Sequence, residues 1–167
     1  MVVQIIDKAF LLAMLFYLAG GSIKGVTRLH KIVFLIQAEV GIGDFAFEPS
    51  KYGPYSQELD SMLRNLVSEG LVAVDEVFDP VYDLLKENPA KILRASLEFL
   101  KTGEREYLEL REKDPAKAIK LKLKVKAYSS MPITYLLAYI YKKYPEYSVM
   151  SIIKEKVELW RKYYGLS

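Results

Sequence analysis

The feature that most constrains the fold of this 167-residue chain is an unbroken run of eleven apolar residues, Ala9–Ala19. The run is too short to span a bilayer, which needs about 20 such residues. Two charged residues stand just before it and residues 1–6 carry no basic leader, which argues against a secretory signal. We therefore predict a helix over residues 4–19 that is apolar on nearly all sides, ends at the glycine pair 20–21 and lies in the core.

The absence of cysteine and the presence of a single histidine, His30, close most familiar routes to catalysis. Without cysteine there is no disulfide, thiolate nucleophile or cysteine-containing zinc site, and one histidine excludes multi-histidine metal centres. The glycine clusters 20–21 and 41–43 match no phosphate-binding or dinucleotide motif. We predict a protein that is not an enzyme and has no catalytic residue, cofactor or metal site. His30 is expected to be hydrogen-bonded and partly buried.

The composition supports a folded, heat-adapted protein. Apolar residues make up 51% of the chain and charged residues 27%, which allows a sizeable core and argues against disorder. Only three Gln and two Asn occur beside abundant Lys, Glu, Ile and Tyr. Because thermolabile residues are depleted in hyperthermophile proteins, this balance predicts a heat-adapted source. We expect a cytoplasmic protein with no membrane partner.

The hydrophobic periodicity of the first hundred residues predicts three helices followed by two strands. Thr27 is expected to cap the second helix, and the third is expected to start at Pro54 and Tyr55, with Ser56 as a candidate cap. The predicted elements are helices at 4–19, 28–40 and 55–69, a very short strand at 45–47, and strands at 71–77 and 93–99 around a helical turn at 82–86. Three helices and a hairpin form the layout of a winged helix, in which a hairpin wing closes the base.

The remainder of the chain is predicted to be helical. The expected helices are 103–112 capped by Thr102, 115–128 opened by Asp114 and Pro115, 133–143 after Pro132, and 149–164 capped by Ser148. Residues 119–126 alternate apolar residues with lysine, which is a strand pattern, whereas the Asp-Pro start and the helix-favouring Ala, Lys and Leu indicate a helix. We predict a helix, which spreads the lysines around the cylinder; a strand would gather them in one basic stripe.

The predicted fold class is therefore mainly α (α+β). A winged-helix-like three-helix core with a small β-hairpin wing is expected over residues 1–101. A helical C-terminal extension, residues 102–167, is expected to pack on that core. The two parts form the predicted domain organisation.

A set of short motifs resembles a known family. They are Leu29–Gln37, Phe45–Ser56 with its Lys51-Tyr52-Gly53-Pro54 element, Leu59, Leu66–Leu71, Met131-Pro132, Leu136-Leu137 and Tyr144–Tyr147. Together they resemble the YwgA-type prokaryotic family, which has a winged-helix-like core, and more distantly the Panacea (SocA-like) antitoxin domain. The resemblance covers about two-thirds of the chain in patches. It implies a winged-helix-like fold without enzymatic activity; the Panacea likeness suggests protein binding, and winged helices suggest DNA.

Charge is distributed unevenly along the chain. Residues 1–113 hold 13 Lys and Arg against 17 Asp and Glu, a net charge of −4, whereas residues 114–167 hold 11 against 4, a net charge of +7. The candidate phosphate-contacting residues are Lys117, Lys120, Lys122, Lys124, Lys126, Lys142 and Lys143. Our first hypothesis is a non-enzymatic, transcription-regulator-like protein that binds double-stranded DNA through this basic half.

The alternative hypothesis is a protein-interaction module, an antitoxin or adaptor, that binds a partner protein through the turn Lys51–Tyr55. The candidate partner or nucleic-acid contacts are Lys51, Tyr52, Tyr55, Gln57 and Arg64. On the third helix, Glu58 and Asp60 stand against Arg64, which makes it a poor approach to a polyanion. A purely structural interpretation is also open, in which the tyrosines of the turn pack against the second helix.

The last helix carries an apolar stripe. Met150, Ile153, Val157, Trp160 and Tyr164 follow each other at spacings of 3, 4, 3 and 4 residues. Such a stripe needs to be buried, either on its own domain or across a dimer. We predict a homodimer, with Trp160, Tyr163 and Tyr164 at the interface.

Overall fold

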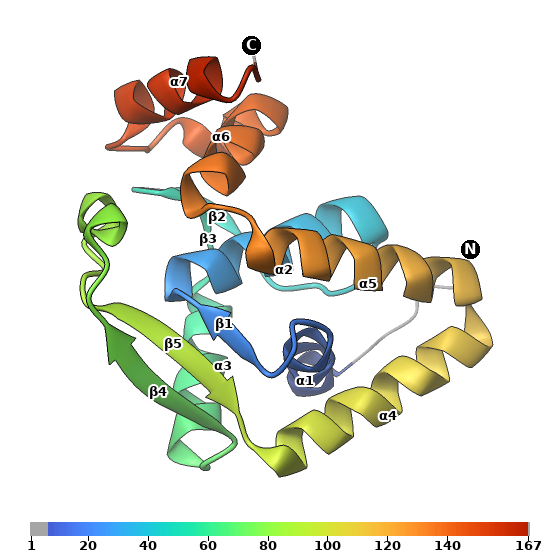
Figure 1. Cartoon of the computed structure of the whole chain (residues 1–167). Coiled ribbons are helices and arrows are strands. Elements are labelled where there is room, and N and C mark those ends of the chain that lie inside the picture. Colours follow the sequence, from blue (N-terminus) through green and yellow to red (C-terminus); the bar gives the residue numbers. More distant parts are fainter. Residues whose placement is uncertain (1–6, 167) are drawn as a thin grey trace.

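A computed structural model of the chain describes residues 7–166, which form a mainly helical protein with a small antiparallel sheet (Figure 1). In chain order the elements are α1 (Lys8–Leu18), β1 (Ser22–Lys24), α2 (Val26–Val40), β2 (Glu48–Ser50), β3 (Gly53–Tyr55), α3 (Gln57–Ser68), β4 (Val72–Val77), η1 (Pro80–Leu85), β5 (Ala90–Ala95), α4 (Leu97–Lys113), α5 (Pro115–Ser130), α6 (Ile133–Lys143), η2 (Pro145–Ser148) and α7 (Lys154–Tyr163). The elements η1 and η2 are 3-10 helices.

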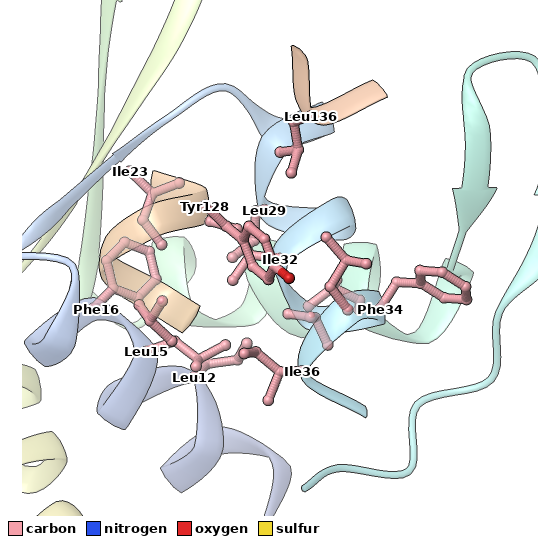
Figure 2. Close-up of a cluster of buried hydrophobic side chains, with 14 of the residues drawn as sticks. Leu12, Leu15, Phe16, Ile23, Leu29, Ile32, Phe34, Ile36, Tyr128 and Leu136 are labelled. Carbon is pink, nitrogen blue, oxygen red and sulfur yellow. The ribbon is translucent and has the colours of Figure 1, made fainter. Parts of the chain in front are cut away.

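Helix α1 is the centre of the core, as its apolar sequence predicts. Six consecutive residues, Leu11–Phe16, are completely buried. Figure 2 shows Leu12, Leu15 and Phe16 of α1 in one cluster with apolar residues of α2 and with Tyr128 and Leu136 from the later helices. The helix begins at Lys8 after Asp7, whose carboxylate accepts a hydrogen bond from the Ala9 amide. The predicted residues 4–6 lie outside the described residues.

The sheet has the strand order β1-β5-β4, and both pairs are antiparallel. The periodicity gave no sign of β1, which is only three residues long. Strand β5 starts three residues before the predicted 93 and ends at Ala95, because Ser96 caps α4 by accepting a hydrogen bond from the Phe99 amide. Beyond Val72 every residue of β4 is exposed, so this strand forms a solvent-exposed edge of the sheet.

A second hairpin, β2–β3, corrects the prediction around the Lys-Tyr-Gly-Pro motif. The predicted strand at 45–47 is wrong: strand β2 begins at Glu48 and pairs with β3. Pro54 therefore lies in a strand and not in the first turn of α3. That helix begins at Gln57 behind Ser56, whose hydroxyl accepts a hydrogen bond from the Leu59 amide at 3.1 Å. The serine cap expected from the sequence is confirmed.

Helix α2 is capped from a distant part of the chain. It starts at Val26, so Thr27 lies inside the helix and the predicted threonine cap is wrong. The N-cap residue is a glycine without a side-chain acceptor, and the carboxylate of Glu87 accepts hydrogen bonds from the Val26 and Thr27 amides instead. A carboxylate at a helix N-terminus is stabilising because it satisfies unpaired amides and the positive end of the helix dipole.

Two more predicted caps in the second half are wrong. Thr102 lies inside α4, which begins five residues earlier, at Leu97, and runs without a break across positions 101 and 102. Ser148 closes η2, with its hydroxyl donating to the Pro145 carbonyl, so α7 does not begin until Lys154. Helices α5 and α6 are confirmed. Asp114 caps α5, accepting a hydrogen bond from the Lys117 amide at 3.1 Å.

The C-terminal helices α6 and α7 pack together at one end of the molecule, with the β2–β3 hairpin beside α6 and η2 (Figure 1). Helices α4 and α5 form two sides of a corner that encloses α1. Among the described residues, 7–166, no helix has the length and apolarity needed to cross a membrane.

Candidate functional site

The lysines of two helices meet at one carboxylate. Glu39 near the end of α2 has a side chain that is only 4% exposed, and it lies between α5 and α6. The Nζ atom of Lys124 is 3.5 Å from one carboxylate oxygen and that of Lys143 is 2.7 Å from the other. The hydroxyls of Tyr128 and Tyr139 donate hydrogen bonds to the same carboxylate. Glu39 therefore ties the basic ends of α5 and α6 together.

The electrostatics of this cluster favour full ionisation. Burial alone would raise the pKa of Glu39, but hydrogen bonds from Lys143, Tyr128 and Tyr139 and the charge of Lys124 lower that pKa to about 2. Hydrogen bonds to Glu39 and Tyr139 raise the pKa of Lys143. Two ammonium groups share one carboxylate, so the cluster keeps a net charge of +1.

The five lysines of α5 do not form a single stripe. Because 3.6 residues make one helical turn, Lys117, Lys120 and Lys124 lie on one flank, the side on which Lys124 reaches Glu39. Lys122 and Lys126 lie on the opposite flank. There they border a pocket of about 270 Å³ that is also lined by Tyr17, Leu18, Gly20 and Tyr107.

We use the name basic flank for Lys117, Lys120 and Lys124 of α5 together with Lys142 and Lys143 at the end of α6. Neither α5 nor α6 contains an acidic residue. Lys120, Lys142 and Lys143 are exposed and the other two are half-buried. The basic flank is a positive surface whose two halves are joined at the Glu39 carboxylate.

The outer face of α3 has the opposite character. Glu58 pairs with Lys8 of α1 at 2.6 Å. Arg64 is 71% exposed but lies 3.3 Å from Asp60 on its own helix. Gln57 is exposed at the start of the helix. The two predicted contacts on this helix, Gln57 and Arg64, therefore stand in an acidic surrounding that does not favour a polyanion.

In the predicted turn Lys51–Tyr55, only Lys51 is fully exposed. Tyr52 and Tyr55 are half-buried, and the ring of Tyr55 stacks on His30 with the centroids 4.7 Å apart. The backbone carbonyl of Lys51 accepts a hydrogen bond from the Ile152 amide at 3.0 Å. The tyrosines thus pack inward, as the structural interpretation of the motif expects, and the turn rests on the loop before α7.

A pocket of about 210 Å³ lies between α2 and the β2–β3 hairpin. Its walls include Val26, Thr27, His30 and Lys31 of α2 and the half-buried Tyr52 of the turn. The hydrogen bond expected for His30 is confirmed, since His30 Nδ1 accepts from the Ser56 amide at 3.2 Å, and the side chain is buried more completely than the partial burial expected from the sequence. Lys31, which was not among the residues predicted from the sequence, is also buried. The sequence feature that could have identified Lys31 is its position within an apolar stretch of α2.

The environment of this pocket disfavours positive charge on both side chains. Burial and the neighbouring Lys31 lower the pKa of His30 to about 3, although an oxygen of Asp60 lies 3.8 Å from Nε2. Burial lowers the pKa of Lys31 to about 7, an effect partly opposed by the charge of Glu87. The Lys31 Nζ donates a hydrogen bond to the Pro54 carbonyl at 2.8 Å.

Of the three aromatic residues predicted at a dimer interface, two are half-buried and one is exposed. Trp160 and Tyr164 are half-buried, and the Tyr164 hydroxyl lies 2.6 Å from the Thr134 hydroxyl of α6. Tyr163 is 83% exposed. Met150 is 64% exposed and precedes α7, so its assignment to the helical stripe is wrong. Helix α6 covers the rest of the stripe within one chain, and the homodimer stays a prediction.

Within residues 7–166 no group of three or more His, Asp or Glu side chains is placed to hold a metal ion. Comparison of the chain with protein-family models, with curated proteins and with solved structures finds no match.

Proposed function

We propose that this chain is a non-enzymatic nucleic-acid-binding protein that contacts the phosphates of double-stranded DNA through the basic flank. The observation that carries the proposal is the meeting of Lys124 and Lys143 at Glu39, which joins the lysines of α5 and α6 into one surface without another acidic residue on either helix. Neutralisation of phosphates by lysine and arginine supplies most of the affinity of sequence-independent DNA binding.

The arrangement of the first hundred residues supports a winged-helix-like core. In the order α1, β1, α2, β2, β3, α3, β4, η1, β5, the strands β4 and β5 form a hairpin after the third helix, and β1 completes a three-stranded sheet. In DNA-binding proteins of this kind the third helix enters the major groove. Here Glu58 and Asp60 make that helix an unfavourable reader, so we infer that the main contacts come from the basic flank instead.

The experiment is fluorescence anisotropy with a labelled duplex of mixed sequence, titrated across salt concentration. Five lysines and one shared carboxylate should give a slope of log K against log salt of about −4. The double variant Lys117→Gln/Lys120→Gln removes two contacts and should make the slope shallower by about 1.8. Neither residue is among the buried residues of α5, so the fold should survive.

The matched control is Lys122→Gln/Lys126→Gln, which removes the same charge from the opposite flank of the same helix. This variant should keep the slope of the unmodified protein. If both pairs change the slope equally, DNA contact is not confined to the basic flank. If the unmodified protein does not bind at low salt, the proposed function is wrong.

A second candidate function, binding of a partner protein, is favoured by one observation. The loop between η2 and α7 exposes Val149, Met150 and Ile152 by 64%, 64% and 59%. The Ile152 amide is hydrogen-bonded to the Lys51 carbonyl, so this apolar loop and the exposed lysine of the hairpin belong to one surface. Exposed apolar residues beside a charged rim are typical of protein interfaces.

The second candidate is tested by pull-down with the unmodified protein and the variant Met150→Asp. A partner that the variant loses, and that Leu97→Asp retains, would place the contact at this loop. Leu97 is a suitable control because it is 72% exposed at the start of α4. A partner retained equally by both variants would exclude the loop as its binding surface.

A further inference from the structure

The pocket between α2 and the β2–β3 hairpin has an unusual set of polar groups. Besides Lys31 and His30, the polar side chains around it are the hydroxyls of Thr27, Ser50 and two tyrosines. No carboxylate lines it. The pocket therefore offers hydrogen-bond donors to an occupant, and the carboxylate closest to His30 is that of Asp60, which lies 3.8 Å from Nε2 without lining the pocket.

Among the side chains around the pocket, Lys31 has the most hydrogen-bond donors without a partner. It lies in the second turn of α2 and is 2% exposed, and its Nζ has one hydrogen bond, to the Pro54 carbonyl. An ammonium group has three donors, and a buried one is costly unless it is paired with an anion or well hydrogen-bonded. The nearby carboxylate of Glu87 is already engaged by the amides at the start of α2. An anion in the pocket would supply the missing partner.

His30 adds a second donor. Its Nδ1 accepts the Ser56 amide proton, so the neutral ring carries its own proton on Nε2. That nitrogen is buried and has no hydrogen-bond partner within the described part of the chain. An unpaired buried donor is costly, and polar atoms of this kind usually have a partner. His30 lines the same pocket as Lys31.

The size and walls of the pocket limit the ligand. A volume of about 210 Å³ corresponds to roughly seven water molecules, or a small organic molecule. Val26 and the rings of Tyr52 and Tyr55 give it apolar walls. Ser50, Tyr52 and Tyr55 of the hairpin and Val26 and Thr27 of α2 are only half-buried, so the pocket opens between the hairpin and the start of α2.

We propose that this pocket is a binding site for a small organic carboxylate with an apolar body, whose carboxylate is held by Lys31 and His30 and whose body lies against Tyr52 and Tyr55. The site does not involve the basic flank, so this proposal is tested independently of the proposed DNA binding.

Binding of an anion is expected to be coupled to protonation of Lys31. The ionisable groups in the surroundings of Lys31 are His30, Tyr52 and Tyr55 of the pocket, together with Glu87, Tyr141 beside Gly53, and Asp60, whose carboxylate faces His30. Burial gives Lys31 a pKa of about 7 and raises the pKa of Tyr141 to about 12, so near neutral pH Lys31 is the group that titrates. A carboxylate favours the ammonium form, and its affinity should fall about tenfold per pH unit above pH 7.

The test is isothermal titration calorimetry of the full chain with benzoate, and with benzamide as a neutral molecule of the same shape. Benzoate should bind at least tenfold more tightly than benzamide at pH 6. At pH 8 its binding should take up close to one proton, measured from the heats in buffers of different ionisation enthalpy. The single histidine provides a second readout, since benzoate should shift the NMR signals of His30.

The variant Lys31→Met should lose the preference for benzoate over benzamide, and its affinity should no longer depend on pH. The variant Lys117→Gln/Lys120→Gln should bind benzoate like the unmodified protein. If Lys31→Met does not fold, the pH dependence and the His30 shift in the unmodified protein decide the question. Equal binding of benzoate and benzamide, tighter binding of inorganic phosphate, or no binding of benzoate would overturn the proposal.

Discussion

Gly103 of α4 faces the backbone of Ala13 in α1 so closely that a Cβ atom at position 103 would lie 2.1 Å from the Ala13 carbonyl oxygen. Real Cβ atoms essentially never approach to this distance. The crossing of α1 and α4, visible in Figure 1, therefore depends on the absence of a side chain at this position. Because α1 is the centre of the core, the packing of the whole molecule rests on this contact.

The first prediction concerns Gly103→Ala. Alanine is favoured over glycine in a helix by about 1 kcal/mol. We expect the opposite sign here, a loss of about 3 kcal/mol in the free energy of unfolding, because the new methyl group forces two backbones apart. Urea unfolding followed by circular dichroism measures this change. The control Thr102→Ala, on the same helix, should change stability by less than about 1 kcal/mol, and a stabilised Gly103→Ala would contradict the close crossing.

The second prediction concerns Glu39. Its folded pKa of about 2 lies below its ordinary value of 4.5, so its stabilisation is fully present above pH 4.5 and is lost as the pH falls toward 2. Glu39→Gln should lower stability at pH 7 by on the order of 3 kcal/mol and flatten the pH dependence between 4.5 and 2. Thermal unfolding at several pH values measures both the loss of stability at pH 7 and the change in its pH dependence. Glu112→Gln, an exposed control on α4, should change neither.

The third prediction concerns His30, the only histidine in the chain. Its folded pKa of about 3 lies below the ordinary 6.5, so the unfolded chain takes up a proton that the folded chain refuses. Stability should therefore fall as the pH drops from 6.5 toward 3, by about 1.4 kcal/mol per pH unit from this group. In an NMR titration the imidazole signals should not move between pH 7 and pH 4. A midpoint near 6.5 would mean that the ring is accessible to water.

The fourth prediction separates two neighbouring tyrosines of the last helix. Tyr164 is hydrogen-bonded to Thr134 and packs edge-on against Tyr135, whereas Tyr163 is 83% exposed. Tyr164→Phe should cost about 1 kcal/mol, and Tyr163→Phe should cost less than about 0.5 kcal/mol. The fluorescence of the single tryptophan, Trp160, follows unfolding of this helix directly. Equal effects would indicate that Tyr163 is also buried, as in a dimer.

Local sequence patterns predict the cores of four helices. Those of α1, α3 and α6 follow from their apolar residues, and that of α5 follows from its Asp-Pro start and helix-favouring composition, against a period-two pattern. The caps at Ser56 and Asp114 follow from local residue chemistry. The errors occur where long-range contacts decide. The cap of α2 is Glu87, about sixty residues away, and β1 exists only because β5 is available to pair with it. The choice between Ser96 and Thr102 as the cap of α4 depends on where β5 ends.

In the candidate sites, too, the sequence predicts the local features and misses those that depend on long-range contacts. The sequence locates the lysines, but their grouping depends on Glu39, which belongs to a helix some eighty residues before α5 and has no local relation to them. Lys31 was overlooked because a single lysine in a helix is normally an exposed residue. Its burial follows from the β2–β3 hairpin, whose Pro54 carbonyl covers the Nζ atom.

Arg28 links the first hundred residues to the end of α5. Its guanidinium is buried and donates hydrogen bonds to the carbonyls of Tyr128 and Met131, at 3.0 and 2.6 Å. A chain that ended at residue 101 would keep the positive charge of Arg28 but lose the carbonyls of Tyr128 and Met131, which accept its hydrogen bonds. We therefore expect that the segment 1–101 does not persist as a proteolytic fragment, and that the intact chain melts in a single calorimetric transition.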